Sequence, residues 1–381
     1  MLKIIVYFLL FISSYSMNYL NISKLDTQSR KGIIFLNINS FNKIGVNLTK
    51  SKKKFILNTD IGKYYLKGDK IVTLHKEYTY ISKPFVFHGK DYIPLKLILE
   101  LNGFHLKDNE IIKSSEPKNP NTLPKRVISL SPGITENIFA LGGKDLLVGR
   151  TSFSKYPKEV ENIDIVGTMF EPNLEIILNK NPDIVIAETH FREKLMTTLN
   201  SLNIAAIKHN TPRNILEIYR NITNLGVLIG RRLEARGLNA SLKDKVHYTQ
   251  YILRDQKIPK VYYVLDSGKT DITPGGDTFI NSLIELSGGE NIAKEKTGWR
   301  YSLEELILNN PNIIFGNQRS INNMLMEENY HFLSAIKNKN YYIINDDSIF
   351  NLPGPRALTE GIYEMVKIFH PKLAEELKDI Y

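Results

Sequence analysis

The sequence predicts an α/β protein in which two Rossmann-like lobes are joined by a long helix and preceded by a small α+β domain. Short apolar strands alternate with helical stretches from Arg126 onward, one helix–strand unit occurs twice, and a long helical stretch separates the copies. At 381 residues the chain is too long for one ordinary domain. We divide it into a signal peptide (1–16), an α+β domain (17–112), a linker (113–125), an N-lobe (126–228), a bridging helix (229–256) and a C-lobe (257–381).

The N-terminus has the features of a secretory signal peptide. Lys3 precedes an apolar run from Ile4 to Ile12, and small residues follow at Ser14 and Ser16. The run is shorter than the about 20 residues that a membrane-spanning helix needs. We expect export to the periplasm or cell envelope and a mature chain beginning near Met17, with an uncleaved anchor as the alternative.

The composition excludes several kinds of chemistry. Because the chain contains no cysteine, we expect no disulfide, no zinc–thiolate site, no thiol catalysis and no lipidation at a cysteine. The first 125 residues hold 20 Lys and Arg against 9 Asp and Glu, whereas the remainder is nearly neutral. This distribution argues against a nucleic-acid function for the main body. The basic front section indicates either a solvated lysine-rich face or contact with an anionic envelope surface.

The front section reads as short strands broken by Gly, Asp and Asn. A hairpin turn is predicted at 88–91, and Pro94 opens a helix over 95–101 that Gly103 ends. A linker rich in Pro, Asn and Ser follows.

The repeat lies in the second part of the chain. Residues 173–186 and 302–315 share one register, with an N-cap residue, Leu, Glu, an apolar helix, Asn-Pro and a buried strand. Two copies of one α/β unit indicate two similar lobes. The stretch between them keeps helical spacing up to Pro259, which predicts a semi-rigid bridge.

Residues 126–381 resemble the helical-backbone (class III) periplasmic binding proteins of iron-siderophore, haem and cobalamin ABC importers. The motifs are "RVISLSPGITENIFALGGKDLLVGRTSFSKYP", "VGTMFEPNLEIILNKNPDIVIA", "TFINSLIELSGGENIA" and "LPGPRALTEGI". The resemblance implies a monomeric transport protein that is not an enzyme, carries no cofactor or metal site of its own, captures a metal chelate and docks onto a permease dimer. The motif "FVFHGKDYIPLKLILELNGF" resembles the copper-amine-oxidase-like N-terminal domain, although its histidines form no metal-ligand set.

The candidate ligand site lies where strands end, because ligands of open α/β sheets bind beyond the carboxyl ends of the strands. The loop Ser131, Pro132 and Gly133 follows the first strand, and a helix starting at Thr135 would favour anionic groups there. An ordinary strand-to-helix turn is the alternative. Tyr156 matches a segment where the family places an aromatic ring against its ligand, and a core tyrosine is the alternative.

Further candidates come from both lobes. Met169 and Phe170 stand where cobalamin binders carry a tryptophan, which weakens the vitamin interpretation. Glu188 and His190 follow a strand, and His190 would ligate haem iron or serve as polar lining. In the second lobe the candidates are Trp299, Arg319 and Arg356, the last two for ligand carboxylates.

Glu175 and Glu304 occupy equivalent points of the two repeats. A glutamate in the first turn of a helix is normally a surface residue that compensates the helix dipole. The family resemblance implies instead that this pair docks onto arginines of the two permease subunits, with Glu305 as a substitute in the second lobe.

Two other functions remain open. A two-lobed α/β enzyme is disfavoured by the absence of G-x-G-x-x-G after a strand, a Walker loop, G-x-S-x-G and H-E-x-x-H. An envelope adhesion or scaffold protein acting through the front domain is the other alternative. The sequence does not distinguish haem, ferric siderophores and corrinoids as ligands.

Overall fold

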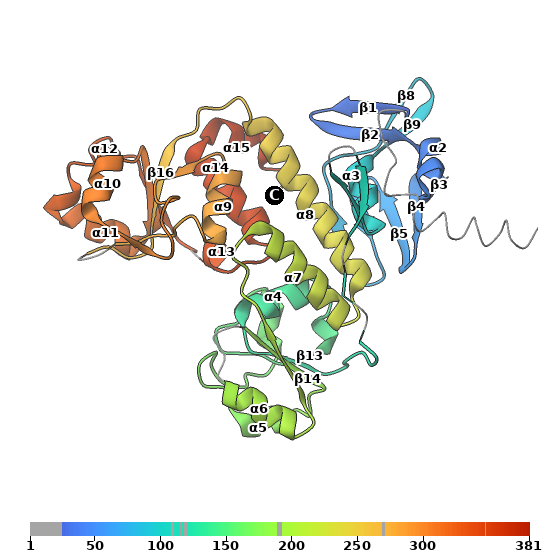
Figure 1. Cartoon of the computed structure of the whole chain (residues 1–381), viewed down its shortest axis with the longest axis horizontal. Helices are drawn as coiled ribbons and strands as arrows, with labels where there is room; N and C mark the ends of the chain where they lie inside the picture. Colours follow the sequence, from blue (N-terminus) through green and yellow to red (C-terminus); the bar gives the residue numbers. More distant parts are fainter. Residues whose placement is uncertain are drawn as a thin grey trace, which may run out of the picture.

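The computed structural model describes residues 25–381 except 108–109, 115, 118–119, 189–192, 269–270 and 347. The predicted signal peptide lies outside the described residues. The predicted fold class is confirmed, because the chain forms two separate parallel sheets, linked by the long helix α8 (Arg232–Leu253), and a strand-rich domain that lies on the other side of α8 from both lobes (Figure 1). Among the described residues, no helix combines the length and the apolar character needed to cross a membrane.

The N-terminal domain consists of antiparallel strands and one longer helix. Its sheets have the strand orders β1-β2-β9-β8 and β3-β4-β5-β6-β7, with β10 and β11 as a separate hairpin. The expected turn joins β8 and β9, with positive φ at His88 (46°) and Gly89 (73°) as tight hairpin turns require. The elements are β1 (Thr27–Arg30), β2 (Ile33–Asn37), α2 (Ile38–Phe41), η3 (Asn42–Ile44), β3 (Asn47–Ser51), β4 (Lys54–Thr59), β5 (Gly62–Lys67), β6 (Lys70–Val72), β7 (Glu77–Thr79), β8 (Phe85–Phe87), β9 (Lys90–Pro94), α3 (Leu95–Leu101), β10 (Phe104–Lys107) and β11 (Glu110–Lys113).

The N-lobe is built on a parallel sheet of order β13-β12-β14-β15. The inner strand β14 is apolar without alternation because helices cover both faces of the sheet, and residues 184–187 are all buried. The elements are β12 (Val127–Ser129), α4 (Pro132–Ala140), η4 (Lys144–Leu146), β13 (Leu147–Gly149), η5 (Lys158–Asn162), α5 (Leu174–Asn179), β14 (Ile184–Glu188), α6 (Glu193–Ser201), β15 (Ala205–His209) and α7 (Ile215–Leu228).

The C-lobe repeats this plan with a parallel sheet of order β18-β16-β20-β21. The repeat seen in the sequence appears as α5 followed by β14 and α10 followed by β20. The N-cap side chains Asn173 and Ser302 each accept a hydrogen bond from the backbone N–H three residues on. The elements are β16 (Lys260–Val264), β17 (Asp271–Ile272), α9 (Phe279–Leu286), β18 (Glu290–Asn291), β19 (Arg300–Tyr301), α10 (Leu303–Asn309), β20 (Ile313–Asn317), α11 (Gln318–Met326), η6 (Glu328–Tyr330), α12 (Ser334–Lys337), β21 (Tyr341–Ile344), α13 (Ser348–Asn351), the π-helix η7 (Ala357–Gly361), α14 (Ile362–Phe369) and α15 (Pro371–Leu377).

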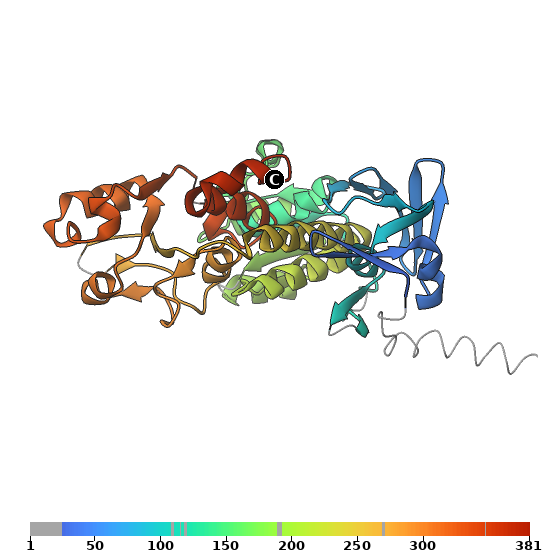
Figure 2. The same cartoon turned by 90° about the horizontal axis from the view of Figure 1, so that it is seen from above.

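The N-terminal domain packs along α8, and Figure 2 shows it at the end of the molecule opposite the C-lobe. Arg236 of α8 is buried and forms ion pairs with Asp60 (Nη1–Oδ1 2.9 Å) and Glu116 (Nε–Oε1 2.6 Å). Asp244 accepts hydrogen bonds from the backbone N–H groups of Ile81 and Ser82 at 2.6 and 3.0 Å. Since Glu116 belongs to the predicted linker, that segment is anchored to α8 at this point.

Candidate functional site

The two lobes meet at the carboxyl ends of their sheets. Helix α4 follows β12 of the N-lobe, and the segment 353–356 follows β21 and α13 of the C-lobe. A Cβ placed on Gly354 would lie 3.5 Å from Oε1 of Glu136 in α4. This arrangement is the one that the strand-end rule predicts for a ligand cleft between lobes.

Tyr156 and Arg356, predicted independently from the two lobes, are brought together. The guanidinium carbon of Arg356 lies 4.0 Å from the centroid of the Tyr156 ring, which is a cation–π distance. Tyr156 is 43% exposed, so the ring is partly open to solvent and is not a core tyrosine. The Tyr156–Arg356 pair therefore joins the two lobes, although the two residues are 200 positions apart in the sequence.

The guanidinium of Arg356 already contacts three carboxylates of the protein. Its Nη2 lies 2.9 Å from Glu360 and 3.1 Å from Asp346, both in the C-lobe, and its Nη1 lies 3.9 Å from Glu136 of the N-lobe. A ligand carboxylate at Nη2 would therefore replace Asp346 or Glu360, whereas Nη1 makes only the 3.9 Å contact with Glu136.

Glu136 is a buried carboxyl that the sequence analysis missed. Burial raises its pKa from 4.5 to about 7, and the charge of Arg356 opposes that rise only in part. Its Oε1 and the neighbouring Asn137 Oδ1 have no hydrogen-bond partner within the described part of the chain. The sequence does not single out Glu136, because helical periodicity does not show which part of the protein packs against the face of α4 that carries it.

The loop Ser131, Pro132 and Gly133 differs from expectation. Helix α4 begins at Pro132 and not at Thr135, as a proline at the first helical position favours. Ser131 is only 1% exposed, and its Oγ has no partner among the described residues. A Cβ on Gly133 would lie 3.1 Å from Glu188 Oε1, so Glu188 lies beside this loop, since β12 and β14 are neighbouring parallel strands.

Phe170 and Trp299 stand at equivalent positions of the two lobes, each three residues before the N-cap of the repeated helix. Their exposed fractions are 60% and 44%, which is high for such large rings. Phe170 packs edge-on against Phe153, with ring centroids 6.0 Å apart, while Met169 is half-buried. Phe153 was missed, although it lies in the motif that contains Tyr156.

The remaining ligand candidates are less informative. Arg319 is exposed in the first turn of α11, directly after β20, where the strand-end rule expects cleft residues. His190 lies outside the described residues. No group of three or more His, Cys, Asp or Glu within the described ranges could hold a metal ion.

Glu175 and Glu304 are exposed second residues of α5 and α10. Glu305 is instead held by the N-cap Ser302 (Oγ–Oε2 3.0 Å) and by an ion pair with Lys296. Glu304 therefore matches the exposed Glu175 better than Glu305 does, because the carboxylate of Glu305 is already bound by Ser302 and Lys296.

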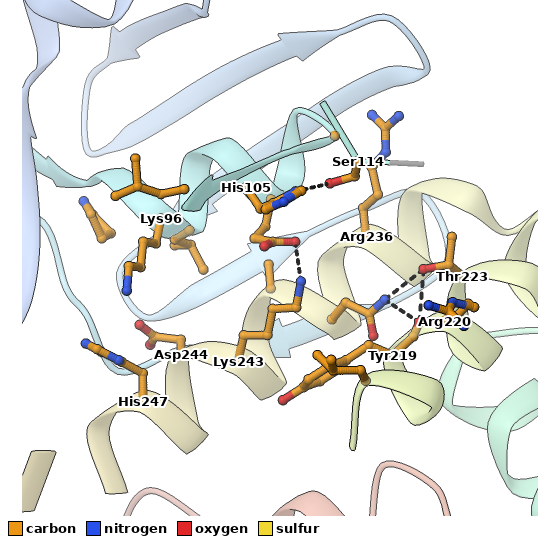
Figure 3. A pocket seen from close by; sticks show the side chains of 18 of the residues that line it. Lys96, His105, Ser114, Tyr219, Arg220, Thr223, Arg236, Lys243, Asp244 and His247 are labelled. Atoms are coloured by element: carbon orange, nitrogen blue, oxygen red, sulfur yellow. Dashed lines mark hydrogen bonds and ion pairs between the residues drawn. The ribbon is translucent and has the colours of Figure 1, made fainter. Parts of the chain in front are cut away.

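A cavity of about 620 Å³ lies away from the cleft, between the N-terminal domain and helices α7 and α8 (Figure 3). Lys96 of α3 and Arg220 of α7 lie on its walls, and Glu100 pairs with Lys243 across it at 2.7 Å. None of the described ligand candidates lines this cavity.

Two α/β lobes that face each other across a site, with a helix as the bridge, define a bilobal solute-binding protein. The chain belongs to the periplasmic binding protein family, whose model matches residues 127–347. The relatives are binding proteins, so the chain is a binding protein and not an enzyme.

The relatives cover mainly the two-lobed part. The chain is 28% identical over 263 residues to an uncharacterized ABC transporter substrate-binding lipoprotein of Bacillus subtilis, which covers 66% of this chain and 82% of the relative. It is 29% identical over 191 residues to a cobalamin-binding protein of Halobacterium salinarum, which covers 48% of this chain and only 51% of the relative. A crystal structure from Staphylococcus epidermidis, described as a possible iron-binding protein, superimposes with a TM-score of 0.59 at 24% identity, covering 65% of this chain and 99% of that one, and shows the shared fold.

Proposed function

We propose that the protein is the substrate-binding component of an ABC importer and captures a ferric siderophore, haem or a corrinoid. The observation that carries this proposal is the pair Phe170 and Trp299, two half-exposed aromatic rings at equivalent positions of facing lobes. Aromatic faces bind flat macrocycles and catecholates over a large apolar area. The names of the relatives, which include a cobalamin-binding protein and a possible iron-binding protein, support this ligand class.

The acidic groups of such a ligand would bind the arginines of the site. Arg356 would exchange a contact with Asp346 or Glu360 for a ligand carboxylate, because a guanidinium binds either in the same forked geometry. Arg319 would serve a second acidic group. Ser131 and Glu188 would take polar groups near the start of α4.

Trp299 makes the proposal directly testable, because it is the only tryptophan in the chain. Titration with haemin, cyanocobalamin and a ferric catecholate siderophore should quench its fluorescence with one of the three. Phe170→Ala should weaken binding of that compound by about tenfold or more, corresponding to about 1.4 kcal/mol of lost ring contact. Phe332→Ala is the matched control, since Phe332 is also exposed (68%) but precedes β21 at the amino end of the sheet. The proposal is wrong if none of the three compounds binds.

Delivery would use a different surface. Glu175 and Glu304 would each contact an arginine of one permease subunit, so a two-lobed protein would present one charge to each half of the channel. Their exposed positions in the first turns of equivalent helices support this assignment.

The N-terminal domain would be a copper-amine-oxidase-like module of an exported protein. Its motif residues form the β8–β9 hairpin and α3, which are consecutive in the structure. Envelope attachment is the function that we consider for it next.

A further inference from the structure

Lysines gather at one end of the sheet β3–β7. The turns after β3 and after β5 lie at the same end, because the strands run in an antiparallel meander. Lys52 and Lys53 form the first turn, Lys54 begins β4 and Lys67 ends β5. We call these four residues the lysine edge.

The lysine edge places like charges directly opposite each other. Lys54 pairs with Lys67 across β4 and β5, and Lys67 pairs with Lys70 across β5 and β6. Opposite side chains on neighbouring strands are about 4.5–5.5 Å apart at Cβ, and like charges there destabilise a sheet. The arrangement therefore does not serve the stability of the domain.

Nearby carboxylates leave this edge largely uncompensated. Lys70 pairs with Glu77 at 2.9 Å, and Lys50 pairs with Asp91 at 2.7 Å, so these two flanking lysines are neutralised. Asp69, in the turn after Lys67, pairs with Lys83 at 3.2 Å. Within the described residues, no carboxylate forms an ion pair with any member of the lysine edge. Lys54 only lies near the Tyr65 ring, with Nζ 4.8 Å from its centroid.

Both ends of this sheet contact α8. At the end remote from the lysines Asp60 pairs with Arg236, and at the lysine end Ile81 and Ser82, which follow β7, donate to Asp244. The four lysines themselves belong to the N-terminal domain, so a partner bound to them contacts a different domain from the two lobes. The N-terminal domain also lies at the end of the molecule opposite the C-lobe (Figure 2).

We propose that the lysine edge binds a flexible phosphate polymer of the cell envelope and retains the protein there while the lobes stay free. An ammonium group meets a phosphate as a point charge without fixed geometry, whereas recognition of carboxylates favours the arginine fork. The cations at this end of the sheet are lysines without an arginine among them, so they fit a polymer whose charges shift along the surface. This inference does not depend on the identity of the captured ligand.

The test uses the full chain and fluorescently labelled long-chain inorganic polyphosphate, followed by anisotropy at increasing salt. Each phosphate contact contributes about 0.7 to the slope of log affinity against log salt for a single-stranded polyanion. Removal of four lysines should lower that slope by about 2–3 and weaken binding at low salt at least tenfold. The variant combines Lys52→Asn, which suits the positive φ of 54° there, with Lys53→Gln, Lys54→Gln and Lys67→Gln.

A charge-matched control separates this edge from net charge. It removes four exposed lysines of the binding domain and should keep polyphosphate affinity within about twofold, because distant surface charges are screened. The control substitutions are Lys158→Gln, Lys194→Gln, Lys257→Gln and Lys372→Gln. Should the fourfold edge variant unfold, the pair Lys53→Gln and Lys67→Gln should lower the slope by about half as much.

Three results would overturn the proposal. They are the absence of polyphosphate binding at low salt, an equal loss in the control variant, and binding of phosphatidylglycerol vesicles without binding of the polymer. Phe170→Ala should leave polymer binding unchanged, so a failed ligand assignment and a failed lysine edge give different outcomes.

Discussion

Replacing Glu136 with glutamine should stabilise the folded protein at pH 8 and leave its stability at pH 4 nearly unchanged. The folded protein keeps the Glu136 proton up to a pKa of about 7, whereas the unfolded chain loses it near 4.5. The contribution of Glu136 to the free energy of unfolding is therefore highest below pH 4.5 and falls as the pH rises through that window. At 1.36 kcal/mol per pH unit, the loss by pH 8 is about 3 kcal/mol. Glutamine resembles the protonated carboxyl, so the variant should avoid this loss.

Urea unfolding at the two pH values, followed by Trp299 fluorescence and circular dichroism, measures the difference. Glu375→Gln is the control, since Glu375 is exposed on α15 and its replacement should change stability by less than about 0.5 kcal/mol. An equal gain at both pH values, or no gain at pH 8, would refute the argument that burial between the lobes controls this proton.

Three further predictions concern the contact between Arg236 and Glu116, the docking glutamates and the rigidity of the bridging helix. Arg236→Ala should destabilise the protein by about 1.5–3 kcal/mol in urea unfolding, because the buried Glu116 loses one of its two cations and keeps Arg232, whereas the exposed Arg213→Ala should have little effect. Combined Glu175→Lys and Glu304→Lys should leave ligand affinity unchanged and weaken permease association by about 1.5–3 kcal/mol per lost contact, with loss of ligand binding as the contrary result. X-ray scattering with and without ligand should give nearly the same radius of gyration because α8 bridges the lobes, and a large change would contradict a rigid bridge.

Much of the architecture follows from local patterns in the sequence. Strand–helix alternation, the repeated Asn-Pro unit and the N-caps Asn173 and Ser302 depend on residues a few positions apart, so they can be read without a structure. The hairpin at His88 and Gly89 is equally local. The start of α4 is also local, since Pro132 favours the first helical position, and the predicted start at Thr135 is three residues too late.

Only the tertiary structure decided the contents of the cleft and the place of the N-terminal domain. Glu136 and Arg356 are 220 positions apart, and their pairing depends on how two lobes pack against each other. Likewise, Glu116 reads as part of a linker until α8 brings Arg236 to it. Periodicity determines which face of an element is apolar, whereas burial and partners across elements determine whether a polar side chain binds a ligand, joins two lobes or remains in solvent.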